Sequence, residues 1–266
     1  MKNDFCIIYI ATGEKYRSEC LKSVKSAKAV MPDIPIILWT DSSYSKSDET
    51  GNWFDDINII DNPQFSLFDK ILPLTKTSYK KNIFLDTDTY VLHSFYEISD
   101  LLERFDMAFC HAPVRIPYKG YINQEIPICF PQPNTGVIAF NHNQDTVRLF
   151  REWENIYDYQ LKNEFPPPAQ DQPAFQKALY FSDIHFTILP SEYNTRTVYP
   201  IFKGGNSFAK ILHGRGFNLE NAIKNINNSY KYVELYDFRK SKANRSKIQK
   251  LKSKIKQIYK TFSSQE

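Results

Sequence analysis

The stretch NIFLDTDTYVL, residues 82–92, decides how the rest of the chain is interpreted. An apolar run at residues 83–85 leads directly into Asp86 and Asp88, which alternate along an extended backbone and can face one side at a strand end. Ligands of open α/β sheets bind outside the carboxyl ends of strands. Two close carboxylates favour a divalent cation. The pair therefore fits either a metal clamp for a nucleotide-sugar diphosphate or the nucleophile and acid of an aspartate-based phosphohydrolase.

The composition is that of a globular enzyme. The 266 residues are enough for one large α/β domain, and the 42% hydrophobic and 15% aromatic content excludes a disordered chain. The four cysteines form no CxxC pair, which argues against a zinc knuckle. The first residues contain no apolar segment typical of a signal peptide, and no stretch approaches the roughly 20 apolar residues of a membrane-spanning helix. We therefore expect a cytoplasmic location.

The net charge of +4 is unevenly distributed along the chain. Ten of the 34 Lys and Arg residues lie from Arg239 onward, where Glu266 is the one acid, so the remainder carries 24 basic and 29 acidic residues. Apolar residues recur at spacings of three and four over residues 248–262. Residues 239–266 are thus predicted to form a basic amphipathic helix, suited to peripheral contact with the inner membrane face or to packing on the body or another subunit. No nucleic-acid partner is expected, because only this tail is basic and it lacks interleaved aromatic residues.

Hydrophobic periodicity predicts a β-α-β opening, which favours a parallel sheet, followed by further alternating elements. Strands are predicted at residues 5–11, 36–39, 57–60, 83–86, 105–110, 135–140 and 184–189. Helices are predicted at residues 14–30, 65–74, within 91–104, 145–161 and 170–179. Residues 111–133 and 190–216 are expected to be irregular, apart from a short apolar piece at 210–212.

Several further segments follow one another in a set order. They are ATG (11–13) with Tyr16, DKILPLTKTSYKKNIFLDTDTYVL (69–92), PNTGVIAFN (133–141), QDQPAF (170–175), LPSEYN (189–194) and ILHGRG (211–216). Over residues 5–216 this series resembles the motifs of GT-A glycosyltransferases, especially glycogenin and the bacterial lipopolysaccharide galactosyltransferases. The resemblance implies an α/β fold: a single GT-A, Rossmann-like nucleotide-diphospho-sugar transferase domain with a mixed central sheet at residues 1–238, followed by the C-terminal helical tail.

The resemblance also implies roles for the matched residues. Asp86, Asp88 and His213 are the expected ligands of Mn²⁺ or Mg²⁺, and the nitrogen ligand favours Mn²⁺. Gln170 and Asp171 are expected beside the reacting anomeric carbon, although helix N-capping is an equally good interpretation of Asp171. Donor binding is expected from Ala11, Thr12, Tyr16, Lys70, Asp86, Thr87, Asn134, Thr135, Gly136, Asn194, Gly214 and Arg215.

Two basic positions remain open on sequence grounds. The family often carries a lysine soon after its HxxG segment, whereas this chain reads His213-Gly214-Arg215-Gly216. Arg215, Lys203 and Lys210 are therefore all candidates for contacting the β-phosphate, and Arg suits a bidentate contact. Lys70 is expected either to pair with Asp88, to touch the donor sugar, or to be a solvated helix lysine.

Together these features predict a metal-dependent glycosyltransferase of polysaccharide biosynthesis. The donor is expected to be a nucleotide sugar, foremost a UDP-sugar, and the acceptor a glycan or glycolipid, with retention of configuration implied by the resemblance. Two alternatives remain. A haloacid-dehalogenase-like phosphohydrolase with Asp86 as nucleophile is disfavoured by the β-α-β unit before the motif and by the lack of a second acid pair. The other alternative is a catalytically silent nucleotide-sugar binder.

Overall fold

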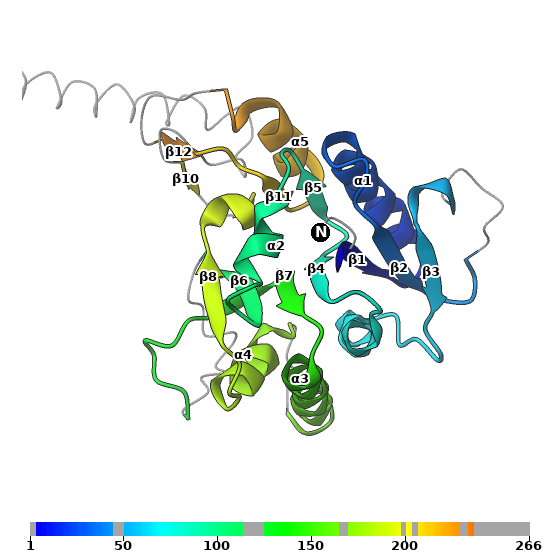
Figure 1. Cartoon of the computed structure of the whole chain (residues 1–266), viewed down its shortest axis with the longest axis vertical. Coiled ribbons are helices and arrows are strands. Elements are labelled where there is room, and N and C mark those ends of the chain that lie inside the picture. The colour runs from blue at the N-terminus through cyan, green and yellow to red at the C-terminus, as the bar shows by residue number, and fades with distance from the viewer. Residues whose placement is uncertain are drawn as a thin grey trace, which may run out of the picture.

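The computed structural model describes residues 4–44, 51–113, 125–164, 170–197, 201–203, 207–228 and 234–236. In this part of the chain, seven strands form a central sheet in the order β3-β2-β1-β4-β7-β6-β8, with helices on both faces (Figure 1). No helix among these residues is long and apolar enough to cross a bilayer. The expected tail helix at residues 239–266 and the expected domain boundary at 238 lie outside the described residues.

The elements follow the alternating order expected for an α/β chain. The central strands are β1 (Phe5–Ala11), β2 (Ile36–Thr40), β3 (Asp56–Ile59), β4 (Lys81–Leu85), β6 (Met107–His111), β7 (Pro133–Asn141) and β8 (Phe186–Leu189). The α-helices are α1 (Glu14–Val30), α2 (Glu97–Leu101), α3 (Gln144–Asn163), α4 (Gln172–Tyr180) and α5 (Gly216–Asn225). Shorter strands are β5 (Thr89–Val91), β9 (Thr195–Arg196), β10 (Ile201–Lys203), β11 (Ile211–His213) and β12 (Glu234–Tyr236).

The central sheet is mixed, as the family resemblance implied. Strands β3, β2, β1 and β4 run parallel to one another, but β7 runs antiparallel to both β4 and β6. This reversal places the first residues of β7 beside the last residues of β4, with Val137 paired to Leu85. The carboxyl end of β4 and the amino end of β7 therefore meet at one edge of the sheet.

Both faces of the sheet are buried. Along β1, Ile7 and Tyr9 belong to the cluster packed under α1 and α2, whereas Ile8 and Ile10 belong to the cluster packed under α3 and α4. This alternation is the two-residue period of a strand, and it explains why β1 is apolar throughout. In Figure 1, α1 lies on one side of the sheet and α3 and α4 on the other.

Two segments differ from the sequence-based expectation. Residues 65–74, predicted as one helix, form two short 3₁₀ helices, η3 (Leu67–Lys70) and η4 (Leu72–Lys76). Phe65 has a φ of 52°, outside the helical region, and Pro73 in η4 removes a backbone donor. Residues 190–216, predicted as largely irregular, contribute β9 and β11 to a second sheet of order β5-β11-β9.

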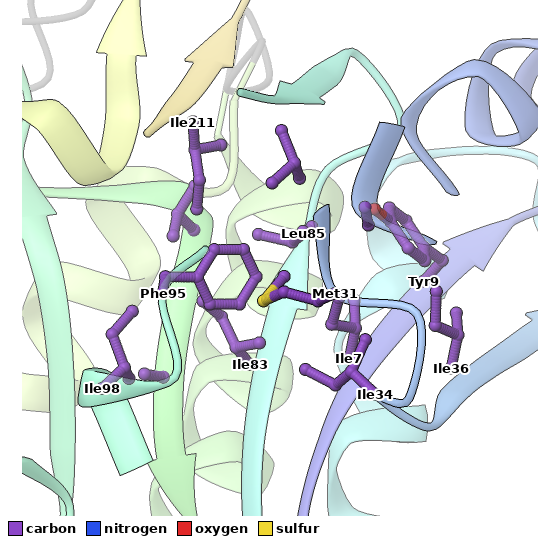
Figure 2. Packing of buried hydrophobic residues seen from close by; sticks show 14 of the residues in the cluster. Ile7, Tyr9, Met31, Ile34, Ile36, Ile83, Leu85, Phe95, Ile98 and Ile211 are labelled. Atoms are coloured by element: carbon purple, nitrogen blue, oxygen red, sulfur yellow. The ribbon is translucent and has the colours of Figure 1, made fainter. Parts of the chain in front are cut away.

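Phe95 tests the core on the α1 and α2 side of the sheet. Its side chain is fully buried, lies edge-on to Phe5, and gathers with Met31, Leu85 and Ile98 in Figure 2. We expect Phe95→Ala to lower the free energy of unfolding by about 3–5 kcal/mol, because a cavity replaces a buried ring. Urea denaturation measures this, with the 61% exposed Phe181→Ala as matched control. Equal effects of the two substitutions would contradict the packing described here.

Candidate metal and donor site

The acidic pair lies in a turn at the carboxyl end of β4. The strand ends at Leu85, and the amide of Thr89 donates to the Asp86 carbonyl at 3.2 Å, so Asp86 and Asp88 are not on extended backbone as the sequence suggested. The turn nevertheless brings both carboxylates to one cavity. Thr87, expected to bind the donor, donates a hydrogen bond from its hydroxyl to Glu19 at 2.7 Å.

His213 reaches the acidic pair through the second sheet. Strand β11 pairs antiparallel with β5, which places His213 opposite Thr89, and the amide of Gly214 donates to the Asp88 carbonyl at 2.9 Å. His213 Nε2 lies 3.1 Å from Asp88 Oδ1 and 3.6 Å from Asp86 Oδ2. The expected triad is thus assembled from residues more than a hundred positions apart.

The donor set of this triad fits a divalent cation. Among the described residues, Asp86, Asp88 and His213 are the one group of three His, Cys, Asp or Glu side chains whose ligand atoms lie within 4.8 Å of one another. Nδ1 of His213 is engaged by Asn194 Oδ1 at 2.9 Å, which leaves Nε2 to face the carboxylates. Two carboxylates and one imidazole form a mixed oxygen and nitrogen donor set of the kind that holds divalent cations in proteins.

The two carboxyl groups have opposite pKa shifts. Burial raises the pKa of Asp86, and the neighbouring Asp88 and Asp171 add to the rise, against Lys70 and His213. Burial also acts to raise the pKa of Asp88, but His213 and Arg215 outweigh it and hold the pKa below its usual value. Close carboxyl groups with diverging environments are typical of a binding or catalytic centre.

Gly136 allows the imidazole to sit against the sheet. A Cβ at this position would lie 2.0 Å from His213 Cε1 and 2.8 Å from Asp86 Oδ2. The Gly136 carbonyl also accepts a hydrogen bond from the amide of Asp86 at 2.8 Å. Gly136 of the NTG segment therefore brings the backbone of β7 into contact with Asp86 and His213, two of the three expected metal ligands.

Lys70 and Asp171 form a buried ion pair deeper in the cavity. Lys70 Nζ lies 2.9 Å from Asp171 Oδ2 and 3.7 Å from Asp86 Oδ1, so its carboxylate partner in the turn is Asp86 and not Asp88. Burial acts to lower the pKa of Lys70, but the two carboxylates outweigh it and the pKa is raised. The Asp171 side chain makes no helix-capping hydrogen bond, although the residue stands at the N-cap of α4. The capping interpretation is therefore wrong, and Asp171 faces the cavity.

Arg215 is the candidate phosphate contact that lies at the site. Its guanidinium makes two hydrogen bonds to Glu19, at 2.7 and 3.0 Å, and Nη1 lies 3.3 Å from Asp88 Oδ2. Lys210 instead pairs with Glu97 and lies over the ring of Tyr193, and it does not line the cavity. The side chain of Lys203 lies outside the described residues.

Two buried acids, Asp69 and Asp41, hold the loop of Thr12 and Gly13 in place. The Thr12 hydroxyl donates to Asp69 at 2.8 Å, and the amide of Gly13 donates to Asp41 at 2.7 Å. Gly13 has a φ of 86°, which glycine adopts without strain. Burial alone would raise the pKa of Asp41, but hydrogen bonds from Gly13 and Ser43 and the charge of Arg17 hold it below its usual value.

These groups line one cavity of about 370 Å³. From the expected set it brings together Thr12, Tyr16, Lys70, Asp86, Thr87, Asp88, Asn134, Thr135, Gln170, Asp171, His213 and Arg215. Ala11, Gly136, Asn194 and Gly214 are near but do not line it. Sequence reasoning did not single out Ile10, Ser66, Leu67, Asp69, Gln172 and Arg196, which do. Ser66 and Asp69 form a capping box, and their spacing was the one available signal.

Comparison with known proteins gives a match at the level of structure. No family model and no curated protein matches the sequence. The galactosyltransferase LgtC, solved with donor and acceptor sugar analogues, is 14% identical with a TM-score of 0.53, covering 79% of this chain and 87% of its own. GlyE of Streptococcus pneumoniae is 15% identical with a TM-score of 0.55, covering 79% and 55%. The bifunctional glycosyltransferase WbbM is 16% identical with a TM-score of 0.60, covering 86% and 50%.

The fold is therefore that of the GT-A glycosyltransferases, as the order of the motifs indicated. At these identities the likeness concerns the fold, and the chemistry of this chain rests on its own residues.

Gly136→Ala tests the close packing of the site. The added methyl group would clash with His213 Cε1 and Asp86 Oδ2, so we expect the imidazole to be displaced. Mn²⁺ affinity should then fall about tenfold or more, as it does when a group that orients a metal ligand is lost. Isothermal titration with Mn²⁺ measures this, with Gly216→Ala as control, where the added Cβ meets nothing within 4 Å. The positive φ of Gly216, 61°, makes folding of the control a necessary check. Unchanged Mn²⁺ affinity in folded Gly136→Ala would contradict this packing.

Asp41→Asn tests the anchoring of the loop at Gly13. Because the pKa of Asp41 is lower in the folded protein than in the unfolded chain, its contribution is present above the unfolded pKa of about 3.9 and lost as pH falls through the folded pKa. We expect the substitution to cost about 1.5–3 kcal/mol at pH 7, the range for hydrogen bonds to charged groups, and progressively less in acid. Urea denaturation from pH 7 to pH 3 measures the difference, and a pH-independent difference would contradict it.

Proposed function

We propose that this protein is a metal-dependent glycosyltransferase that moves a sugar from a nucleotide-sugar donor to a glycan or glycolipid acceptor. The observation that carries the proposal is the Asp86, Asp88 and His213 cluster at the end of a cavity in a GT-A fold. A bound Mn²⁺ or Mg²⁺ would act there as a Lewis acid that neutralises the leaving diphosphate. The remaining chemistry belongs to the chain's own side chains.

Arg215 supports the leaving group in this proposal. Its guanidinium is half exposed and stands beside Asp88, at the side of the cavity where the diphosphate would be held. A planar guanidinium can contact two phosphate oxygens at once. Glu19 holds it by two hydrogen bonds before the donor arrives, so little side-chain entropy remains to be lost on binding.

Lys70 and Asp171 hold the sugar end of the donor. Their ion pair is buried and lies next to Asp86, which links the sugar pocket to the metal ligands. Lys70 Nζ lies 2.9 Å from Asp171 Oδ2, and in this scheme the Asp171 carboxyl group accepts sugar hydroxyls or stabilises positive charge at the anomeric carbon. Gln170, which lines the same cavity, is the neutral partner for this role. Retention of configuration follows from the family resemblance and forms part of the proposal.

Thr12 and Tyr16 hold the nucleoside in this scheme. Tyr16 lines the cavity and is 38% exposed, and in this scheme a base stacks on its ring beside Lys15, whose Nζ lies 5.4 Å from the ring centre. A pyrimidine such as uracil suits a stacking surface bounded by the hydroxyl of Thr12, and UDP-sugars are the proposed donors. Growth of a surface polysaccharide at the inner membrane face, with the basic tail as peripheral contact, is the proposed setting.

Replacing both turn acids tests the proposal most simply. We expect Asp86→Ala with Asp88→Ala to abolish Mn²⁺-dependent stabilisation by UDP, since a ligand that binds only the folded state raises the melting temperature. Thermal shift and UDP release from UDP-sugars measure this, with exposed Asp145→Ala and Glu152→Ala on α3 as the matched double control. Full activity of the site variant in chelator would overturn the proposal, and phosphate release without nucleotide would favour the phosphohydrolase alternative. UDP binding without turnover on any sugar would favour the silent binder.

Arg215→Ala tests the phosphate role. The guanidinium is proposed to contact the second phosphate, so we expect UDP affinity to fall about tenfold or more and UMP affinity to change little, as for loss of a charge-assisted hydrogen bond. Isothermal titration with both nucleotides measures the ratio, and Lys210→Ala serves as the control because Lys210 is held outside the cavity by Glu97. An equal loss for UDP and UMP would rule out a β-phosphate contact.

A further inference from the structure

Four buried polar side chains form a continuous chain of hydrogen bonds in the wall of the cavity, which His213, Asn134 and Gln172 line. His213 Nδ1 meets Asn194 Oδ1 at 2.9 Å, Asn194 Nδ2 donates to Asn134 Oδ1 at 2.8 Å, and Asn134 Nδ2 donates to Gln172 Oε1 at 2.8 Å. All four side chains are at most 6% exposed. They come from β11, η5 (Ser191–Asn194), β7 and α4, so the chain joins four elements that are far apart in sequence.

A backbone amide fixes the direction of this chain. The amide of Gly136 donates to Asn134 Oδ1 at 3.1 Å, and a backbone N–H can only donate. The oxygen of Asn134 must therefore face Gly136 and Asn194, which requires Asn194 to present its NH₂ group to Asn134. With its NH₂ group so placed, Asn194 must present its oxygen to His213.

The direction decides which nitrogen of His213 carries a proton. Nδ1 faces a carbonyl oxygen, so Nδ1 must be the donor. Nε2 faces Asp86 and Asp88, at 3.6 and 3.1 Å, and its lone pair is the one available to a cation between these carboxylates. The opposite tautomer would place a lone pair against the Asn194 oxygen between two side chains that are each at most 5% exposed.

We propose that Asn194 and Asn134 are positioning residues that set the Nδ1–H tautomer of His213 and so prepare Nε2 for the metal. The inference rests on the metal site of the proposed function, and it gives these two residues a role other than contact with the donor sugar. Asn194 contacts the imidazole directly. Asn134 acts through Asn194, because the Gly136 amide fixes the Asn134 oxygen and that oxygen in turn orients the Asn194 amide. The Gly136 position serves twice, because its missing Cβ also leaves room for the ring.

The proton on His213 can be observed without metal or substrate. The chain has five histidines, and comparison with His213→Gln assigns the ring signals in ¹⁵N-edited NMR spectra. At a pH where the ring is neutral, we expect Nδ1 of His213 to carry the proton in the wild-type protein. A wild-type spectrum with the proton on Nε2 would overturn the proposal, even if every variant failed to fold.

Two substitutions at Asn194 separate positioning from packing. Asn194→Ala removes the acceptor, so we expect loss of the fixed tautomer and a 10–100-fold weaker Mn²⁺ affinity by isothermal titration, the usual effect of removing a group that orients a metal ligand. Asn194→Asp keeps an oxygen facing Nδ1 and should retain the tautomer, but its second oxygen then faces Asn134 Oδ1, so we expect a lower melting temperature. Asn134→Ala frees the Asn194 amide to reverse and should give a mixture of tautomers.

Asn141→Ala provides the matched control on the same strand. The Asn141 amide donates to the Leu102 and Phe105 carbonyls at 2.7 and 3.0 Å, away from the cavity, so its loss should lower the melting temperature but leave the tautomer and Mn²⁺ affinity unchanged. If Asn194→Ala binds Mn²⁺ as tightly as wild type, the positioning role is wrong while the glycosyltransferase proposal stands. If Asn194 sets the tautomer but wild type binds no metal, the positioning of the proton stands and the metal-dependent function is wrong.

Discussion

The antiparallel pairing of β5 with β11 is the constraint on which the candidate site depends. Strand β5 leaves the acidic turn directly, and β11 returns to it after more than a hundred residues, with His213 opposite Thr89. Without this pairing, Asp86 and Asp88 would be two carboxylates at a strand end, a common and uninformative feature. With it, the imidazole of His213 lies 3.1 Å from Asp88, and Gly136 of β7 packs against both the imidazole and Asp86.

The site also shows how opposite charges are arranged before any ligand binds. Lys70 lies between Asp86 and Asp171, and Arg215 lies between Asp88 and Glu19, so each acid expected to meet a cation or a sugar already has a basic neighbour. Buried charges persist in proteins when they are paired in this way.

How much could be predicted from sequence depended on the range of the contacts involved. Asp86 and Asp88 could be identified from the apolar run that precedes them, and His213 from its place at a strand end before Gly214. Glu19 was not found, because its partner Arg215 lies 196 residues away and nothing local distinguishes it from Glu14, the other acid of the lysine-rich helix α1. The 3₁₀ helices of residues 67–76 were predicted as one α-helix, because the spacing of apolar residues does not reveal the positive φ of Phe65. Gln172 was missed because its hydrogen-bond partner Asn134 lies on another element, 38 residues away.

The central claim is that Asp86, Asp88 and His213 hold a divalent cation that binds the diphosphate of a nucleotide. Anomalous diffraction from crystals grown with Mn²⁺ and UDP tests it most directly, because the anomalous signal distinguishes Mn²⁺ from water and from lighter ions. The account requires one strong peak in direct contact with Asp86, Asp88 and His213 Nε2, with the diphosphate on its open side and Arg215 turned toward it. A strong peak elsewhere, or bound UDP with no metal at these residues, would contradict it.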